Sequence, residues 1–183
     1  MKKVLGVILI FLPGIVFSQG VIKAGAAAGN RWNETLNSQT IGTGLRLSGE
    51  KFVREQLSLG ACISYLSFRP NKQVNVRYNS YSLLTTYYFS DGKLQPYLGI
   101  GIGYTSYTDK TTIELGPGIS DSQKREKNYG NISPYLGLKY GLDKAGKVDV
   151  FLQVNTDFVP VVDIDPIGFA SIAGGLSYQL HHK

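Results

Sequence analysis

Residues 95–107 read QPYLGIGIGYTSY and carry the clearest structural pattern in the chain. From Leu98 to Tyr104, bulky apolar residues alternate with glycine at every second position. A period of two predicts a β-strand, because successive strand side chains point to opposite faces. One face of this strand is apolar and the other has almost no side chains. This arrangement suits lipid on one side and a crowded barrel lumen on the other.

Alternation of this kind recurs along the chain and predicts eight strands. Their expected ranges are residues 21–29, 39–49, 56–68, 73–90, 95–107, 129–142, 148–158 and 169–180. The connections after the second, third, fourth and sixth strands are short, whereas those after the first, fifth and seventh are longer. No helical period of useful length is present. We therefore predict an all-β fold, an eight-stranded antiparallel up-and-down transmembrane β-barrel with both termini on the periplasmic side.

Two segments depart from simple alternation. In the fourth strand the apolar residues change parity, which predicts a β-bulge near Asn79 and Ser80. Residues 108–128 are polar and of mixed charge, and they contain Gly116-Pro117-Gly118. We expect this segment to be the longest and least ordered loop, and a contact surface for a possible surface ligand.

The first 18 residues predict a cleaved signal peptide. Lys2 and Lys3 precede an apolar run, which Pro13 and Gly14 interrupt. The competing interpretation is a transmembrane anchor, but residues 4–17 are shorter than the roughly 20 residues that span a bilayer. Residues 19–183 are therefore expected to form one barrel domain of an exported protein.

Composition narrows the functional classes. The formal net charge of the 183 residues is +6, and the basic residues are scattered, so no nucleic-acid partner is expected. Cys62 is the only cysteine and cannot form an internal disulfide or support a metal site alone. After the N-terminus, no stretch of 18 apolar residues predicts a membrane-spanning helix.

Three segments carry a resemblance to a known family: PYLGIGIGY at residues 96–104, YYFSDGKLQPY at residues 87–97, and Gly175-x-x-Tyr178-x-Leu180 near the end. In these segments the chain resembles the small outer-membrane β-barrel proteins of Gram-negative bacteria, which include the porin-family β-barrel domain and barrels of the OmpA, OmpX and OmpW types. The resemblance implies location in the cell outer membrane, contact with outer-membrane lipid and insertion by the barrel assembly machinery. We also expect a monomer.

Alternation alone leaves two arrangements open. A soluble lipocalin-like carrier would turn its apolar face inward, whereas a membrane barrel turns it outward and lines a narrow lumen with small residues. We favour the second. Aromatic residues near strand ends are then expected to form interfacial girdles. These residues are Tyr65, Tyr88, Phe89, Tyr104, Tyr129 and Phe158.

In the membrane arrangement, five charged residues are expected in the lumen, where opposite charges should pair. They are Lys23, Arg46, Lys139, Asp149 and Asp157. These residues would form either a plug or a selective pore. We favour the plug, because eight strands leave room for little more than packed side chains.

No motif predicts a catalytic, cofactor-binding or metal site. The glycines at 99, 101 and 103 lack the spacing of a nucleotide loop. Asp163 and Asp165 lack the calcium-loop pattern, and His181 and His182 fit a periplasmic tail. We therefore expect a structural or surface-interaction role without enzymatic activity. Small-solute passage, as suggested for OmpW-like barrels, and lipid A modification are the alternatives.

Overall fold

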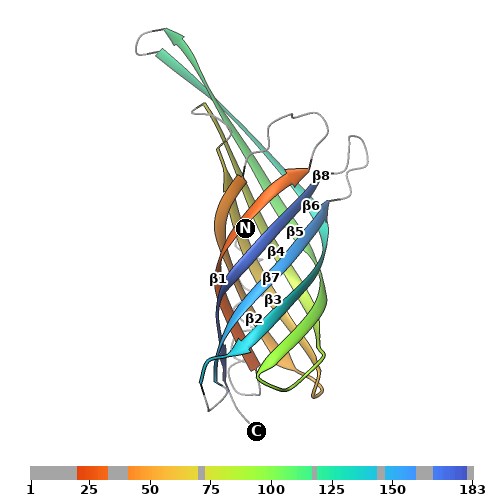
Figure 1. The fold of residues 1–183 in the computed structure, drawn as a ribbon. Coiled ribbons are helices and arrows are strands. Elements are labelled where there is room, and N and C mark those ends of the chain that lie inside the picture. Colours follow the sequence, from red (N-terminus) through yellow and green to blue (C-terminus); the bar gives the residue numbers. More distant parts are fainter. Residues whose placement is uncertain are drawn as a thin grey trace.

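The computed structural model describes residues 20–32, 41–69, 73–116, 119–143, 147–159 and 167–180. They form eight strands: β1 (Gly20–Trp32), β2 (Ile41–Phe52), β3 (Leu57–Phe68), β4 (Val74–Tyr88), β5 (Leu94–Gly116), β6 (Ile119–Gly141), β7 (Val148–Val159) and β8 (Ile167–Gln179). Each strand pairs antiparallel with its neighbour in the chain, and β1 also pairs with β8, which closes the barrel (Figure 1). The predicted eight-stranded antiparallel barrel is confirmed.

Some predictions fall outside this part of the chain. The signal peptide expected at residues 1–18, the two carboxylates Asp163 and Asp165, and the terminal His181 and His182 all lie outside the described residues. The part of the chain that the structure describes contains no membrane-spanning helix.

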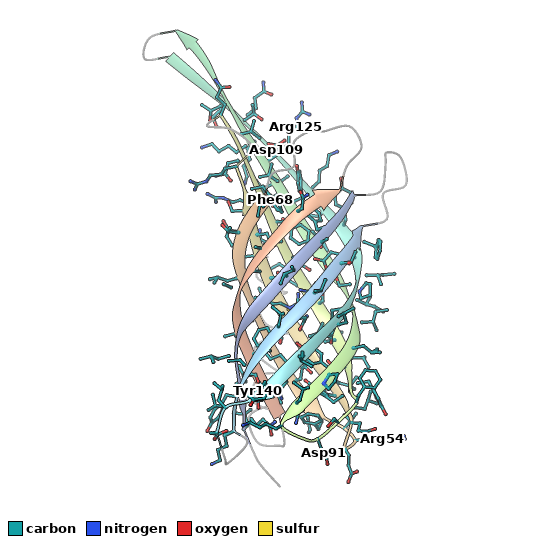
Figure 2. All side chains as sticks on the ribbon, in the orientation of Figure 1. Arg54, Phe68, Asp91, Asp109, Arg125 and Tyr140 are labelled. Atoms are coloured by element: carbon teal, nitrogen blue, oxygen red, sulfur yellow. The ribbon has the colours of Figure 1, made fainter. Side chains whose placement is uncertain are left out.

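The outer surface of the barrel is apolar. Leu83, Ile102 and Leu136 are 71%, 64% and 62% exposed, whereas inward-facing neighbours such as Ser82 and Ser133 are buried. Side chains project outward from the wall on both sides of the barrel in the view of Figure 2. This is the arrangement of a transmembrane β-barrel and contradicts the soluble carrier, whose apolar face would point inward.

The repeated Pro-Tyr-Leu-Gly sequences of β5 and β6 explain why glycine alternates in the opening stretch. The antiparallel register places Tyr97 opposite Gly137 and Gly99 opposite Tyr135. A Cβ atom on either glycine would overlap the ring of the facing tyrosine. Each ring therefore occupies lumen space that the opposite glycine leaves open, and two large side chains fit inside a narrow barrel.

The segment 108–128 is not the loop that the sequence predicted. β5 and β6 continue as a paired hairpin beyond the barrel wall, with Thr108 opposite Glu126 and Glu114 opposite Ser120. The two strands, coloured green to teal, project far past the ends of the other strands (Figure 1). Sequence analysis did not predict these strands because charged residues occur on both faces of the projection. Neither face is apolar, so residues 108–128 show no alternation of apolar and polar residues.

The predicted bulge in β4 is also wrong. Its pairing with β3 and β5 shows no register shift at Asn79 or Ser80. Even-numbered side chains face the lumen along the whole strand, so Val76 and Tyr78 point inward. Tyr88 belongs to this inward set as well and is 2% exposed, which excludes it from the predicted aromatic girdle. The apolar residues of β4 change parity because, in the half nearer the hairpin, apolar side chains face the lumen.

Candidate functional site

The lumen contains two clusters of buried apolar and aromatic side chains. The cluster nearer the projecting hairpin, here called the apolar plug, consists of Ala27, Leu66, Phe68, Val76, Tyr78, Phe151, Phe169 and Ala173. The rings of Tyr78 and Phe169 lie 4.2 Å apart between centroids. The other cluster, nearer the chain termini, consists of Cys62, Leu84, Tyr88, Tyr97 and Tyr135. Polar and charged side chains surround this second cluster and separate it from the plug.

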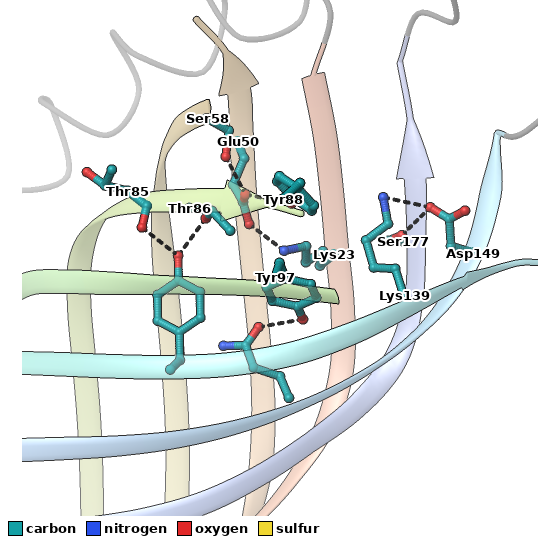
Figure 3. Close-up of polar contacts among 12 residues, drawn as sticks. Lys23, Glu50, Ser58, Thr85, Thr86, Tyr88, Tyr97, Lys139, Asp149 and Ser177 are labelled. Atoms are coloured by element: carbon teal, nitrogen blue, oxygen red, sulfur yellow. Dashed lines mark hydrogen bonds and ion pairs between the residues drawn. The ribbon is translucent and has the colours of Figure 1, made fainter. Parts of the chain in front are cut away.

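Glu50 is the centre of one polar network. Lys23 Nζ lies 2.7 Å from Glu50 Oε1, and the two side chains are 2% and 1% exposed. Ser58 and Tyr88 donate hydrogen bonds of 2.7 and 2.9 Å to Glu50 Oε2. The Lys23 ammonium also lies 4.1 Å from the ring centroid of Tyr97 (Figure 3). The network therefore connects β1, β2, β3 and β4 and satisfies both oxygens of a carboxylate that is shielded from water.

A second network joins the last three strands. Lys139 Nζ on β6 lies 2.9 Å from Asp149 Oδ2 on β7, and Ser177 on β8 donates a 2.9 Å hydrogen bond to the same oxygen (Figure 3). The Tyr97 hydroxyl donates a 2.9 Å hydrogen bond to Gln153 Oε1. Because Tyr97 contacts Lys23 as well, this bond links the Glu50 network to β7. The two networks meet where the Lys139 ammonium lies 5.4 Å from the ring centroid of Tyr88.

Arg46 and Asp157 are buried but do not pair with each other. Arg46 is 7% exposed and its guanidinium lies 5.9 Å from the ring centroid of Tyr135. Asp157 is 3% exposed and accepts a hydrogen bond from Ser133, which in turn accepts one of 2.9 Å from Asn131. Neither charge forms an ion pair with any residue in the described ranges.

The structure thus buries all five charged residues that the sequence placed in the lumen, and it brings together only Lys139 and Asp149. The partner of Lys23 is Glu50, which sequence analysis assigned to a turn. A signal for Glu50 was present: Arg46, Ser48 and Glu50 share the even parity of the inward face of β2. Tyr97 and Tyr135 were also missed as lumen residues, although both belong to the repeated motif.

The interior leaves little room for solute or metal. Inward side chains in the middle of the barrel are buried, including Lys23, Ser80, Asn131 and Gln153, whereas residues lining a water-filled passage would be accessible. Among the described residues, no group of three or more His, Cys, Asp or Glu side chains is arranged to hold a metal ion. The lumen is therefore a packed core with internal ion pairs.

The projecting part of β6 offers a different feature, a free backbone edge. Gly141 N donates to Lys93 O at 2.9 Å and Leu142 N donates to Val148 O at 2.8 Å. Odd-numbered residues of β6 therefore bond to β5, and even-numbered residues face β7. β7 pairs with β6 only as far as Ile132. Beyond that point the backbone N–H and C=O groups of the even-numbered residues face away from β5 and pair with no described strand: Ser120, Ser122, Lys124, Glu126, Asn128 and Gly130.

Comparison with known proteins identifies the fold. No family model matches the chain, and no curated protein matches it. The fold is similar to that of Neisserial surface protein A (NspA), with a TM-score of 0.67, 14% identity and coverage of 87% of this chain and 96% of that one. It is also similar to Ail, the attachment invasion locus protein of Yersinia pestis (TM-score 0.57, 11% identity, coverage 88% and 99%). A third similar structure is the outer membrane protein OprG from Pseudomonas aeruginosa (0.55, 13%, 90% and 97%).

Proposed function

We propose that this protein is an integral outer-membrane β-barrel with a structural or surface-interaction role, and that its contact surface is the projecting part of β5 and β6. The apolar exterior and the fold shared with outer-membrane barrels support this location. Val21 pairs with Gln179, so the start of β1 and the end of β8 lie together at the end of the barrel opposite the hairpin (Figure 1). Periplasmic termini, usual in such barrels, place the hairpin outside the cell. We further propose insertion by the barrel assembly machinery as a monomer.

The free edge of β6 is the observation that carries this proposal. Unpaired backbone groups on a strand edge can add an extended segment of another protein as a further strand. Charged residues on an exposed edge oppose pairing with a second copy of the same edge. Lys124, Arg125 and Lys127 outnumber Glu126 along this edge, so an acidic extended segment fits it best.

A proline on the edge tests the proposal. The N–H of Asn128 faces away from β5, so Asn128→Pro removes an edge donor without removing a bond between β5 and β6. Asn128→Ala is the matched control, because it removes the same side chain and keeps the N–H. Both variants and the native protein would be displayed on a non-adherent bacterium, and attachment to cultured epithelial cells would be counted.

We expect attachment by the native protein and by Asn128→Ala, and loss of most attachment by Asn128→Pro at equal surface expression. Equal attachment by all three displayed proteins would exclude the edge as the contact. Attachment no greater than that of the host bacterium alone would contradict the surface-interaction role itself.

The packed lumen supports the further proposal that the barrel conducts few or no ions. Recording from planar bilayers that contain the full barrel should show no large, steady channels. Such channels would favour the alternative of small-solute passage, which nothing in the burial of the inward side chains supports.

We also propose that the protein is not an enzyme. The alternative, lipid A modification, requires a nucleophile and a base arranged near the outer rim. Mass analysis of lipid A from cells with and without the protein should show identical species. A new deacylated or acylated species would contradict this proposal.

A further inference from the structure

The outward face of β4, β5 and β6 changes character in regular steps along the strands. The register aligns Leu83, Ile102 and Ile132 in one row, and all three are exposed and apolar. The next outward row contains Tyr81 and Tyr104, whose amphipathic rings suit the level of lipid headgroups. Above the tyrosines, every outward residue that the structure describes is polar: Asn79, Ser106 and Asn128, then Arg77, Thr108 and Glu126, then Asn75, Lys110 and Lys124.

Three cations gather in the upper two of these rows: Arg77, Lys110 and Lys124, here called the outward cation patch. Lys110 lies directly opposite Lys124. They form a non-hydrogen-bonded pair, the type in which facing residues approach most closely. Like charges at directly opposite positions destabilise a sheet. The proximity of the two lysines therefore requires a compensating anion or costs stability.

The chain itself supplies little compensation. Lys124 Nζ lies 3.2 Å from Glu126 Oε2, in a pair whose side chains are 62% and 48% exposed. Arg77 and Lys110 form no ion pair with a described residue. The patch thus carries a net positive charge, and its two uncompensated members lie on neighbouring strands.

The height of the patch identifies the kind of anion. Arg77 and Lys110 are four and six residues beyond the tyrosine row, which corresponds to about 10 and 15 Å along the membrane normal for strands tilted by about 40°. Flexible Lys and Arg side chains can reach back toward the interface. The patch also lies on the same face as the apolar rows, so a lipid whose acyl chains contact those rows would place its headgroup against it.

We propose that Arg77, Lys110 and Lys124 bind the phosphate of an anionic membrane lipid in the leaflet nearest the hairpin. The acyl chains of this lipid would lie along the row of Leu83, Ile102 and Ile132. Hydroxyl and amide groups between the tyrosine row and Lys110 would donate hydrogen bonds to the headgroup: Ser106, Thr108 and Asn128. This role does not require the free backbone edge of β6, because it uses side chains of the outward face, and Lys124 is the one cation that it shares with that edge.

Native mass spectrometry of the full barrel, released from detergent micelles after titration with defined lipids, tests the proposal. Phosphatidic acid is the anionic probe and phosphatidylcholine the zwitterionic one. The test variant is Lys110→Gln/Lys124→Gln, and the matched control is Arg125→Gln/Lys127→Gln, which removes the same charge from the inward face of the same hairpin. All four positions are exposed, and heat-dependent gel mobility would verify that each barrel is folded.

We expect the first phosphatidic acid to bind about tenfold more weakly to the test variant than to the native protein, and phosphatidylcholine binding to stay unchanged. The control should bind phosphatidic acid as the native protein does. Equal binding by all three proteins would overturn the proposal. Equal weakening in both variants would also overturn it, since only the overall charge of the hairpin would then matter. Glycerol 3-phosphate should bind far more weakly than phosphatidic acid, and comparable binding would argue against a lipid.

Discussion

The lower and upper halves of β5 and β6 are the same two strands in two different environments. Below Tyr104 and Gly130, apolar residues face outward and small or aromatic residues fill the lumen. Above them neither face carries a continuous apolar row, yet the pairing continues in register to Glu114 and Ser120. In the wall, the contrast between lipid and lumen dictates the alternation. In the projection, β5 and β6 stay paired because the wall has already aligned the two strands in register.

The two halves also differ in how their charges are held. The ion pair of Lys23 and Glu50 inside the barrel is shielded from water, whereas that of Lys124 and Glu126 on the hairpin is exposed. An exposed pair contributes about 0–1 kcal/mol. Removing one partner of a buried pair costs more, because the remaining charge stays buried without compensation. The barrel wall should therefore be sensitive to substitutions that the hairpin tolerates.

Replacing Glu50 should give the largest effect. Glu50→Ala leaves the Lys23 ammonium without its carboxylate and removes the acceptor of Ser58 and Tyr88. We expect the free energy of unfolding to fall by about 3–5 kcal/mol, measured by urea denaturation in lipid vesicles. Glu126→Ala is the counterpart on the hairpin and should change it by less than about 1 kcal/mol. Equal losses would remove the contrast between the halves.

Two glycines on adjacent strands give a second comparison. A Cβ atom at Gly103 would overlap the carbonyl oxygen of Tyr81, whereas at Gly130 the nearest atom is 3.9 Å away. Gly103→Ala should reduce the free energy of unfolding by about 2 kcal/mol through overpacking. Gly130→Ala should leave it unchanged or raise it by about 0.5 kcal/mol. Urea denaturation would measure both variants. A larger loss of unfolding free energy for Gly130→Ala than for Gly103→Ala would show that the wall can move to accept the methyl group at Gly103.

Shortening the hairpin should have a smaller effect. Asp109 and Arg125 form a hydrogen-bonded pair, so residues 110–124 can be replaced by a two-residue Asn-Gly turn. We expect the free energy of unfolding to change by less than about 1 kcal/mol, because the barrel wall and its ion pairs are retained. A larger loss would mean that the projection stabilises the wall.

The smallest effect concerns Asp143 in the turn between β6 and β7. Hydrogen bonds from the backbone N–H groups of Val148 and Lys147 lower the pKa of Asp143. The carboxylate therefore stabilises the fold above its unfolded pKa of about 3.9, and this contribution disappears as the pH falls through the lower folded-state pKa. Asp143→Ala should lower the urea midpoint slightly at pH 6, and the difference should shrink as the pH falls below 4. A difference that does not depend on pH would rule out the carboxylate as its cause.

Most of the wall could be predicted from sequence because one physical rule acts on it. Wherever a strand separates lipid from lumen, its side chains alternate, as at Leu98, Ile100 and Ile102. Val76 and Tyr78 broke the rule because apolar side chains also fill the lumen near the hairpin. The projection was missed because water lies on both of its faces, so no alternation is required there.

The candidate sites were less predictable. The alternation of residues shows that Lys23 and Asp149 face inward. Which side chains pair, however, depends on which residues of different strands lie at the same level of the barrel. The register of the strands determines this, and it cannot be read from the alternation. Glu50 was overlooked because charged and turn-forming residues follow it closely. The outward cation patch depends on the pairing of Lys110 with Lys124, which becomes visible only when the hairpin is known to be paired.

The positions of Arg46 and Asp157 affect how the sheet closes. Of the six buried charged side chains among the described residues, β1–β4 carry Lys23, Arg46 and Glu50, and β5–β8 carry Lys139, Asp149 and Asp157. Each half-sheet holds one internal ion pair, and the charges left over have opposite sign. During insertion the first four strands would thus form a ribbon with one surplus positive charge, and the last four a ribbon with one surplus negative charge. Their mutual attraction, strengthened as water leaves the interior, would favour joining the two ribbons into one cylinder over the pairing of two like ribbons.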